Sequence, residues 1–105
     1  MAQFDVYRNR NPASRSDYPF LVDLQADLLT DLATRVVAPL TAIAPGKSRP
    51  IGALTPELVV DGKRYALITP QLAGVSMKEL GARVASLAVH RDEIVAALDL
   101  LITGI

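Results

Sequence analysis

The C-terminal segment predicts a helix from residue 91 to about residue 102 that is apolar on two sides. Asp92 and Glu93 fall in the expected first turn, where carboxylates favour the positive end of the helix dipole. One stripe at helical spacing consists of Ile94, Ala97, Leu98, Leu101, Ile102 and Ile105. Much of the opposite side is apolar too, through Val95, Ala96 and Leu100.

A single small core cannot easily cover both apolar sides of this helix. Burying a large aliphatic side chain is worth about 1.5–3 kcal/mol, and a chain of 105 residues forms a single core. We therefore expect a second copy of the chain to cover this helix. The alternative is a helix at the centre of a monomer core.

The N-terminal region predicts two antiparallel strands. Phe4 and Val6 alternate with polar or amphipathic neighbours, which indicates a strand with one inward face. Residues 20–25 repeat the pattern, with Phe20, Val22 and Leu24 on one side. The polar, turn-rich residues 9–18 between these runs predict a connecting loop.

The middle of the chain predicts further strands. Residues 58–68 form two β-rich runs joined by Asp61-Gly62, a pair that suits a type I′ hairpin turn. Residues 36–43 are also β-like, but Pro39 cannot donate to a strand ladder, which predicts an edge strand or a bulge. Residues 76–79 match a capping box and predict a short helical turn that ends near Gly81.

Composition excludes several classes of protein. The eleven basic and eleven acidic residues cancel, so no strong field draws the chain to nucleic acid. The absence of cysteine excludes disulfides, thiolate metal sites and cysteine nucleophiles. The first residues lack a signal-peptide pattern, and no apolar run reaches the roughly 20 residues of a membrane span. We expect a cytoplasmic protein that does not contact a membrane.

No catalytic, metal or cofactor site is predicted. The carboxylates lie singly at strand edges, turns and helix starts, so no acid–base pair stands out. His90 is the only histidine and lies just before the last helix, where a structural hydrogen bond is the favoured role. An enzyme is therefore the hypothesis with least support.

Arginines and tyrosines leave two interpretations open. Arg8, Arg10 and Arg15 form either an ordinary solvated edge or a surface that pairs with acidic side chains of a partner. Tyr7, Tyr18 and Tyr65 suit a half-buried sheet face and an interface equally well.

The order of these segments resembles the CcdB family, the toxins of plasmid and chromosomal toxin–antitoxin pairs. Residues 3–7, Gln-Phe-Asp-Val-Tyr, are similar to the family's first strand. Residues 20–29 resemble its Phe-Val-Asp-Val-Gln-Ser-Asp-Ile-Ile signature, and residues 35–40 its strand with an internal proline. Residues 90–105 are similar to the terminal helix, with its His-Arg start and Gly-Ile finish.

The resemblance implies a fold and a function. The fold would be a single domain over residues 1–105, mainly β with a C-terminal α-helix, in which an SH3-like β-barrel forms a homodimer about the helix. The function would be that of a non-enzymatic toxin in a type II module for plasmid maintenance. Such a toxin binds and inhibits DNA gyrase through the gyrase A subunit, a CcdA-like antitoxin neutralises it, and it reaches DNA only through the antitoxin complex.

The resemblance also assigns site residues by matched position. The gyrase-facing residues would be Leu28, Leu29, Asp99, Ile102, Thr103, Gly104 and Ile105. The antitoxin-facing residues would be Tyr7, Arg8, Arg10, Arg15 and Tyr65.

Two positions depart from the family's toxic members. Thr103 stands where those toxins carry tryptophan, and Asp99 stands where they carry an uncharged amide. An indole buries far more surface than a threonine. The second hypothesis is therefore a CcdB-like protein that has lost gyrase poisoning, and that keeps antitoxin binding and autoregulation or binds another protein.

Overall fold

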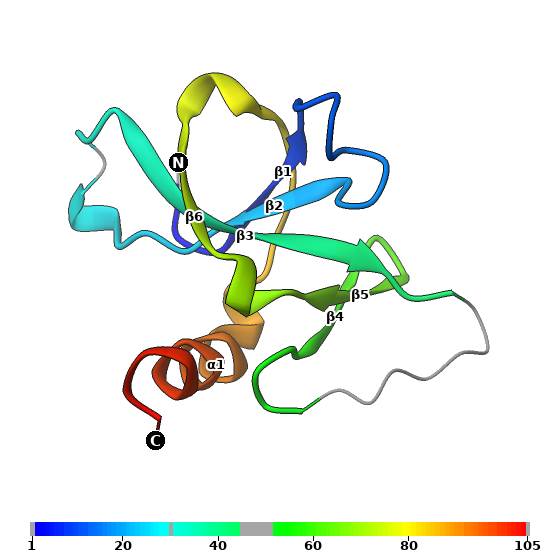
Figure 1. Cartoon of the computed structure of the whole chain (residues 1–105), viewed down its shortest axis with the longest axis vertical. Coiled ribbons are helices and arrows are strands. Elements are labelled where there is room, and N and C mark those ends of the chain that lie inside the picture. Colours follow the sequence, from blue (N-terminus) through cyan, green and yellow to red (C-terminus); the bar gives the residue numbers. More distant parts are fainter. Residues whose placement is uncertain (1, 30, 45–51, 105) are drawn as a thin grey trace.

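The computed structural model describes residues 2–29, 31–44 and 52–104 of the chain. Its strands are β1 (Asp5–Asn9), β2 (Phe20–Asp23), β3 (Thr34–Ala42), β4 (Glu57–Val60), β5 (Lys63–Leu67), β6 (Ala73–Ser76) and β7 (Leu80–Ser86). Within these ranges, four short 3-10 turns accompany them: η1 (Asp27–Leu29), η2 (Thr69–Gln71), η3 (Met77–Glu79) and η4 (Ala88–His90). The chain ends in the helix α1 (Arg91–Thr103) (Figure 1). The prediction of a mainly β fold with a C-terminal helix is confirmed.

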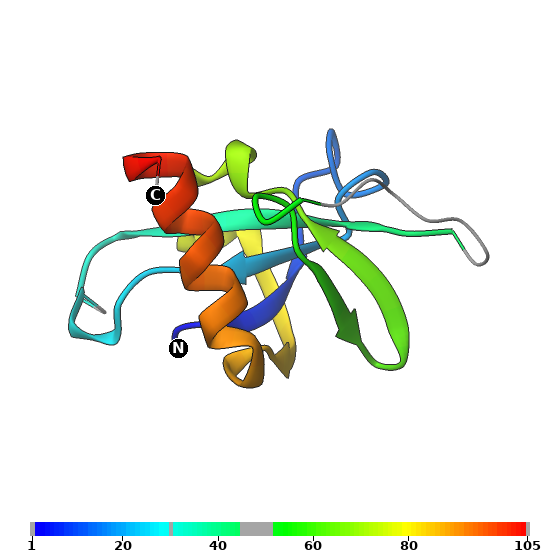
Figure 2. The same cartoon turned by 90° about the horizontal axis from the view of Figure 1, so that it is seen from below.

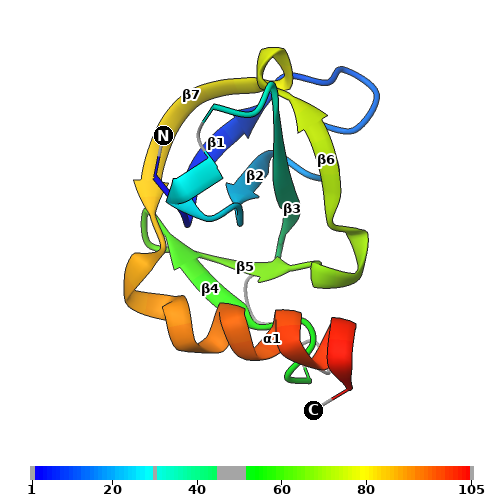
Figure 3. The ribbon, with the colours of Figure 1, turned by 90° about the vertical axis from the view of Figure 1, so that its left-hand side faces the viewer.

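The strands form one curved antiparallel sheet. Their order is β4-β5-β3-β2-β1-β7, and β6 pairs with the first half of β3. Because β4 and β7 stand at opposite ends of this order, the predicted SH3-like barrel is an open half-barrel. Figure 2 places α1 in front of the sheet, and Figure 3 shows the helix running below β4 and β5. The structure describes one chain, so the homodimer stays a prediction.

The main core lies between the concave side of the sheet and α1. It contains aliphatic residues of β1 to β5 together with Leu87 and Ile94. Val95 and Leu98 pack against it from the helix. Helix formation over residues 91–103 agrees with the predicted span, and the buried face of α1 carries Ile94 and Ala97.

The helix faces differ in part from the prediction. The two apolar sides do not separate into one buried and one exposed face: Ile102, of the first stripe, is 73 % exposed, whereas Val95, from the opposite side, packs against the core. The core covers only the first turns of α1, so apolar side chains near its end, Leu100 and Ile102, remain at the surface of the single chain.

A second core covers the other face of the first strands. It consists of Tyr7, Leu21, Val37 and Leu80, with Val75 packed against them. The prediction that β1 buries only one face was therefore wrong. The reason is that β6, η3 and β7 carry the chain back over this face, as Figure 3 shows.

The first strand begins just after Phe4, a residue that the alternating pattern includes in it. Phe4 has a φ of 71°, which interrupts extended backbone, and β1 starts at Asp5. The turn places the Phe4 side chain in the main core, and the Phe4 N–H donates to the Asp23 carbonyl at 2.6 Å. The predicted antiparallel pairing with β2 is confirmed, with Val6 opposite Val22.

Pro39 lies inside a central strand, and its pairing with β2 keeps a regular register, so the prediction of an edge strand or a bulge was wrong. β3 pairs with β2 on one side, and on the other side its first half pairs with β6 and its second half with β5. The Pro39 carbonyl accepts from the Ile68 N–H at 2.9 Å. Because N–H and C=O of one strand residue point to the same side, the missing donor falls where β3 changes partners.

The structure confirms the turns predicted at Asp61-Gly62 and at Ser76. Asp61 and Gly62 have φ angles of 50° and 78°, as a type I′ turn requires, and they join β4 to β5. Ser76 caps η3 by accepting the Lys78 N–H at 3.3 Å. The turn ends at Glu79, however, and the chain continues directly into β7, a strand that the sequence analysis did not predict.

Candidate functional site

The η1 loop displays two leucines at the surface. Leu28 is 95 % exposed and Leu29 is 48 % exposed, although both follow the apolar strand β2. The loop is a single 3-10 turn in which the Leu29 N–H donates to the Ala26 carbonyl at 3.0 Å. Exposed leucine side chains on an ordered turn form an apolar surface that a protein partner can cover.

A buried polar cluster holds this loop in place. Asp23 and Arg35 form an ion pair with side chains 0 % and 1 % exposed, and the Arg35 Nε lies 3.1 Å from the Asp23 Oδ2. The other Asp23 oxygen accepts the Gln25 N–H at 3.0 Å. The Gln25 amide then donates to the Leu29 carbonyl at 2.8 Å, which links the ion pair to the displayed leucines.

The sequence analysis missed this cluster. Asp23 and Arg35 lie twelve residues apart, and each is an isolated charge beside aliphatic neighbours. A charge in a strand that otherwise faces the core is the signal that could have found it, because such a charge needs a partner.

The second part of the candidate gyrase surface is the end of α1. Asp99, Ile102, Thr103 and Gly104 are all exposed there, and Ile105 lies outside the described residues. The Thr103 hydroxyl donates to the Asp99 carbonyl at 2.6 Å, so it is engaged within the helix. Gly104, with a φ of 74°, ends the helix by donating its N–H to the Leu100 carbonyl at 3.1 Å.

The structure places these two parts on the same side of the molecule without joining them. Figures 1, 2 and 3 all show the η1 loop and the end of α1 as separate features on that side. Within one chain they therefore form two apolar patches.

The arginines and tyrosines of the candidate antitoxin surface have different environments. Arg8, Arg10 and Arg15 are exposed, and the Arg8 guanidinium lies 5.9 Å from the centre of the Phe20 ring. Tyr7 and Tyr65 are each only 7 % exposed and belong to the two cores. Their burial limits any partner contact to a ring edge, so the cationic side chains are the accessible part of this surface.

Comparison with protein families supports the resemblance over the whole domain. The family model described as CcdB protein matches residues 3–104. The chain belongs to the CcdB family. The match includes both the η1 loop and the end of α1.

Membership of the CcdB family implies a toxin of a toxin–antitoxin pair, and the toxins of this family act by binding rather than by catalysis. In the described part of the chain, no three His, Asp or Glu residues come together as a metal site would need. The His90 Nδ1 lies 3.1 Å from the Glu93 Oε1, which confirms its predicted structural hydrogen bond. Within the same described ranges, no helix is both long and apolar enough to span a bilayer.

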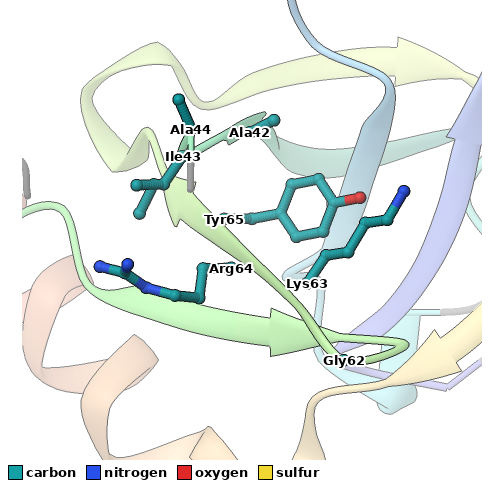
Figure 4. A pocket seen from close by; sticks show the side chains of 7 residues that line it. All are labelled: Ala42, Ile43, Ala44, Gly62, Lys63, Arg64 and Tyr65. Atoms are coloured by element: carbon teal, nitrogen blue, oxygen red, sulfur yellow. The ribbon is translucent and has the colours of Figure 1, made fainter. Parts of the chain in front are cut away.

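A shallow pocket of about 450 Å³ lies beside the β4–β5 turn of this CcdB-family chain. Figure 4 shows the Tyr65 ring and the Lys63 side chain along it, with Ile43 and Ala42 on the other side. Its wall is mostly apolar, and its described lining residues include no carboxylate. The pocket therefore lacks an acid–base pair.

Tyr7 provides a pH-dependent test of the second core. Burial, followed by the nearby carboxylates of Asp5 and Asp23, raises the pKa of Tyr7 above its ordinary value. The folded state thus holds the phenol proton more tightly than the unfolded chain, so stability falls as pH rises above about 10. We expect Tyr7→Phe to lose less stability over that alkaline range, measured by urea unfolding at a series of pH values. Parallel pH profiles for the two proteins would contradict this.

Proposed function

We propose that this chain is the toxin of a type II toxin–antitoxin module, that it binds the A subunit of DNA gyrase, and that a CcdA-like antitoxin neutralises it. The observation that carries the proposal is the exposure of Leu28, Leu29 and Ile102 at positions that the family resemblance assigns to gyrase. Large exposed aliphatic side chains are costly in a free protein, which favours a partner that covers them. A cytoplasmic location, where gyrase works, is part of this proposal.

The proposal includes a homodimer about α1. Leu100 remains exposed near the end of the helix, and a second copy packed against this side of α1 would cover it while leaving Ile102 free. The second copy would also bring the C-terminal ends of two α1 helices together, so that both contribute to a single gyrase-binding surface. Sedimentation of a stable, folded single chain at micromolar concentration would contradict this part.

The direct test is binding to the purified gyrase A subunit, together with growth arrest when the chain is expressed alone. We expect both for a gyrase-directed toxin, and relief of the arrest when the partner antitoxin is expressed with it. Binding of the antitoxin with no binding of gyrase would instead support a diverged member of the family.

Thr103 and Asp99 favour that second candidate function. The short Thr103 side chain is bonded back to the helix, and Asp99 adds a charge beside it. Neither can stack as an indole would on an arginine, a contact worth about 0.5–2 kcal/mol.

Thr103→Trp separates the two candidates. If the residue at this position alone limits poisoning, we expect the substitution to tighten binding to gyrase by about two- to thirtyfold, the equivalent of that stacking energy. Because Thr103 is exposed, the unfolding midpoint should not change, which serves as the control. No tightening in a folded Thr103→Trp protein would show that the missing indole is not what limits binding to gyrase.

A further inference from the structure

The outer edge of β7 is the longest unpaired strand edge in the ranges that the structure describes. β7 has seven residues, pairs with β1 alone and ends the strand order. The other strands with a single partner, β4 and β6, have four residues each. Figure 3 shows β7 along the outer margin of the sheet. Such an edge offers N–H and C=O groups to an extended peptide.

The side chains of β7 leave this edge accessible. Gly81, Ala82 and Ala85 are small, and Ala82, Arg83 and Ser86 are exposed. Arg83 is the only charged residue of the strand. Its Nε forms an ion pair with the Oδ2 of Asp5, on β1, at 3.0 Å. The Arg83 side chain is therefore held toward its own sheet.

Two cationic side chains pack against β7 from β1 and the residue that follows it. Gly81 has no Cβ, and a Cβ built there would lie 3.1 Å from the Arg8 carbonyl oxygen, the Arg8 Cβ and the Arg10 Cγ. The stems of Arg8 and Arg10 therefore lie against β7 at this point. The Arg10 N–H also donates to the Glu79 carbonyl at 3.1 Å, just before the strand begins.

The charge around the edge favours an acidic occupant. Residues 5–10 and 77–86 carry Arg8, Arg10, Lys78 and Arg83 against the acids Asp5 and Glu79, while the whole chain has a net charge of zero. Asp5 is already engaged by Arg83. An extended segment rich in Asp or Glu would gain charge complementarity along with its backbone hydrogen bonds.

We propose that β7 binds an extended acidic segment of the antitoxin as an added strand. This inference rests on the antitoxin binding proposed above and adds the backbone of β7 as the part of the toxin that is recognised. A second copy of β7 is the competing occupant. The two register irregularities between β1 and β7 twist the strand, which disfavours pairing with a long flat edge and suits a short segment.

The test uses the full chain and a short capped peptide of alternating valine and glutamate. Two further versions of the peptide carry N-methyl groups on alternate residues. In one version the methyl groups lie along one edge of the extended peptide, and in the other they lie along the opposite edge. A strand added to β7 donates from one side only, so we expect one methylated version to bind like the parent and the other about tenfold or more weakly. Amide exchange should slow in β7 on binding and stay unchanged in β4.

Charge variants complete the test. Arg10→Glu should weaken binding of the glutamate peptide by about fivefold, the effect of losing one exposed pairing. Lys63→Glu, an equally exposed change on the distant β4–β5 hairpin, is the matched control and should have no effect. A valine–lysine peptide should bind least of all.

Several outcomes would overturn the inference. These are equal binding of the two methylated peptides, no binding of the parent peptide at millimolar concentration, and protection of β7 amides by self-association without peptide. If the antitoxin bound and lost affinity in Arg8 and Arg10 variants, but the two methylated peptides bound equally, strand addition would be ruled out while antitoxin binding itself would stand. Gyrase binding depends on other residues and is measured separately.

Discussion

Arg35→Met should destabilise the protein by about 3–5 kcal/mol, because it leaves the Asp23 carboxylate buried without its partner. A domain of this kind has only about 5–15 kcal/mol in total, so the variant should lie near the limit of folding. The measurement is urea unfolding at a fixed protein concentration, since association would shift the midpoint.

The chain contains its own control for this prediction. Arg64 also pairs with a carboxylate, and its Nη2 lies 2.7 Å from the Glu57 Oε1, but both side chains are substantially exposed. Water screens such a pair, so Arg64→Met should shift the midpoint far less than Arg35→Met. A loss for Arg35→Met no larger than that for Arg64→Met would contradict the prediction.

A double variant separates a stranded charge from simple loss of packing. In Asp23→Asn/Arg35→Met no buried charge remains, and the amide oxygen introduced at position 23 can still accept the Gln25 N–H. We expect this protein to be clearly more stable than Arg35→Met alone. If the double variant were no better, packing and not charge would account for the loss.

Leu28→Glu should weaken binding to the gyrase A subunit by about thirtyfold or more and abolish growth arrest. The side chain is 95 % exposed, so its replacement should change stability by no more than about 0.5 kcal/mol. An apolar anchor at the centre of an interface contributes about 2 kcal/mol or more, which corresponds to the expected change in affinity. The measurements are titration of the purified gyrase protein and the growth of cells that express the variant.

Val89 gives a matched control for that substitution. It is 90 % exposed in η4, at the opposite end of α1 from the candidate gyrase surface. Val89→Glu should therefore leave binding of gyrase unchanged. Equal losses for the two variants would show that added negative charge, and not the position of Leu28, weakens binding.

The parts of the fold that local chemistry determines were predictable from the sequence. Asp61 and Gly62 tolerate the positive φ angles that a type I′ turn requires, and the Ser76 hydroxyl can accept the backbone N–H two residues ahead. The apolar residues of α1 recur at helical spacing. β7 was missed because Gly81 and its alanines have low strand propensity. Its conformation comes from pairing with β1, at the far end of the sequence.

For the candidate gyrase site, the sequence predicted only the residues at the surface. The family resemblance pointed to Leu28 and Leu29, and their exposure agrees with the proposed binding role. The cluster that holds them was not foreseen, because Asp23 and Arg35 meet only when β2 pairs with β3. Tyr7 could have faced a partner, but the second core, which depends on distant strands, buries it.

The pairing of β1 with β7 also bears on how the chain folds during synthesis. Asp5 lies opposite Ser86, so the first strand cannot acquire its second neighbour until β7 has left the ribosome. Contacts of such long sequence separation slow folding, because a large loop must close before they form. The sheet of the nascent chain therefore stays incomplete until β7 has been made, and the complete fold forms only after this strand and α1 are free.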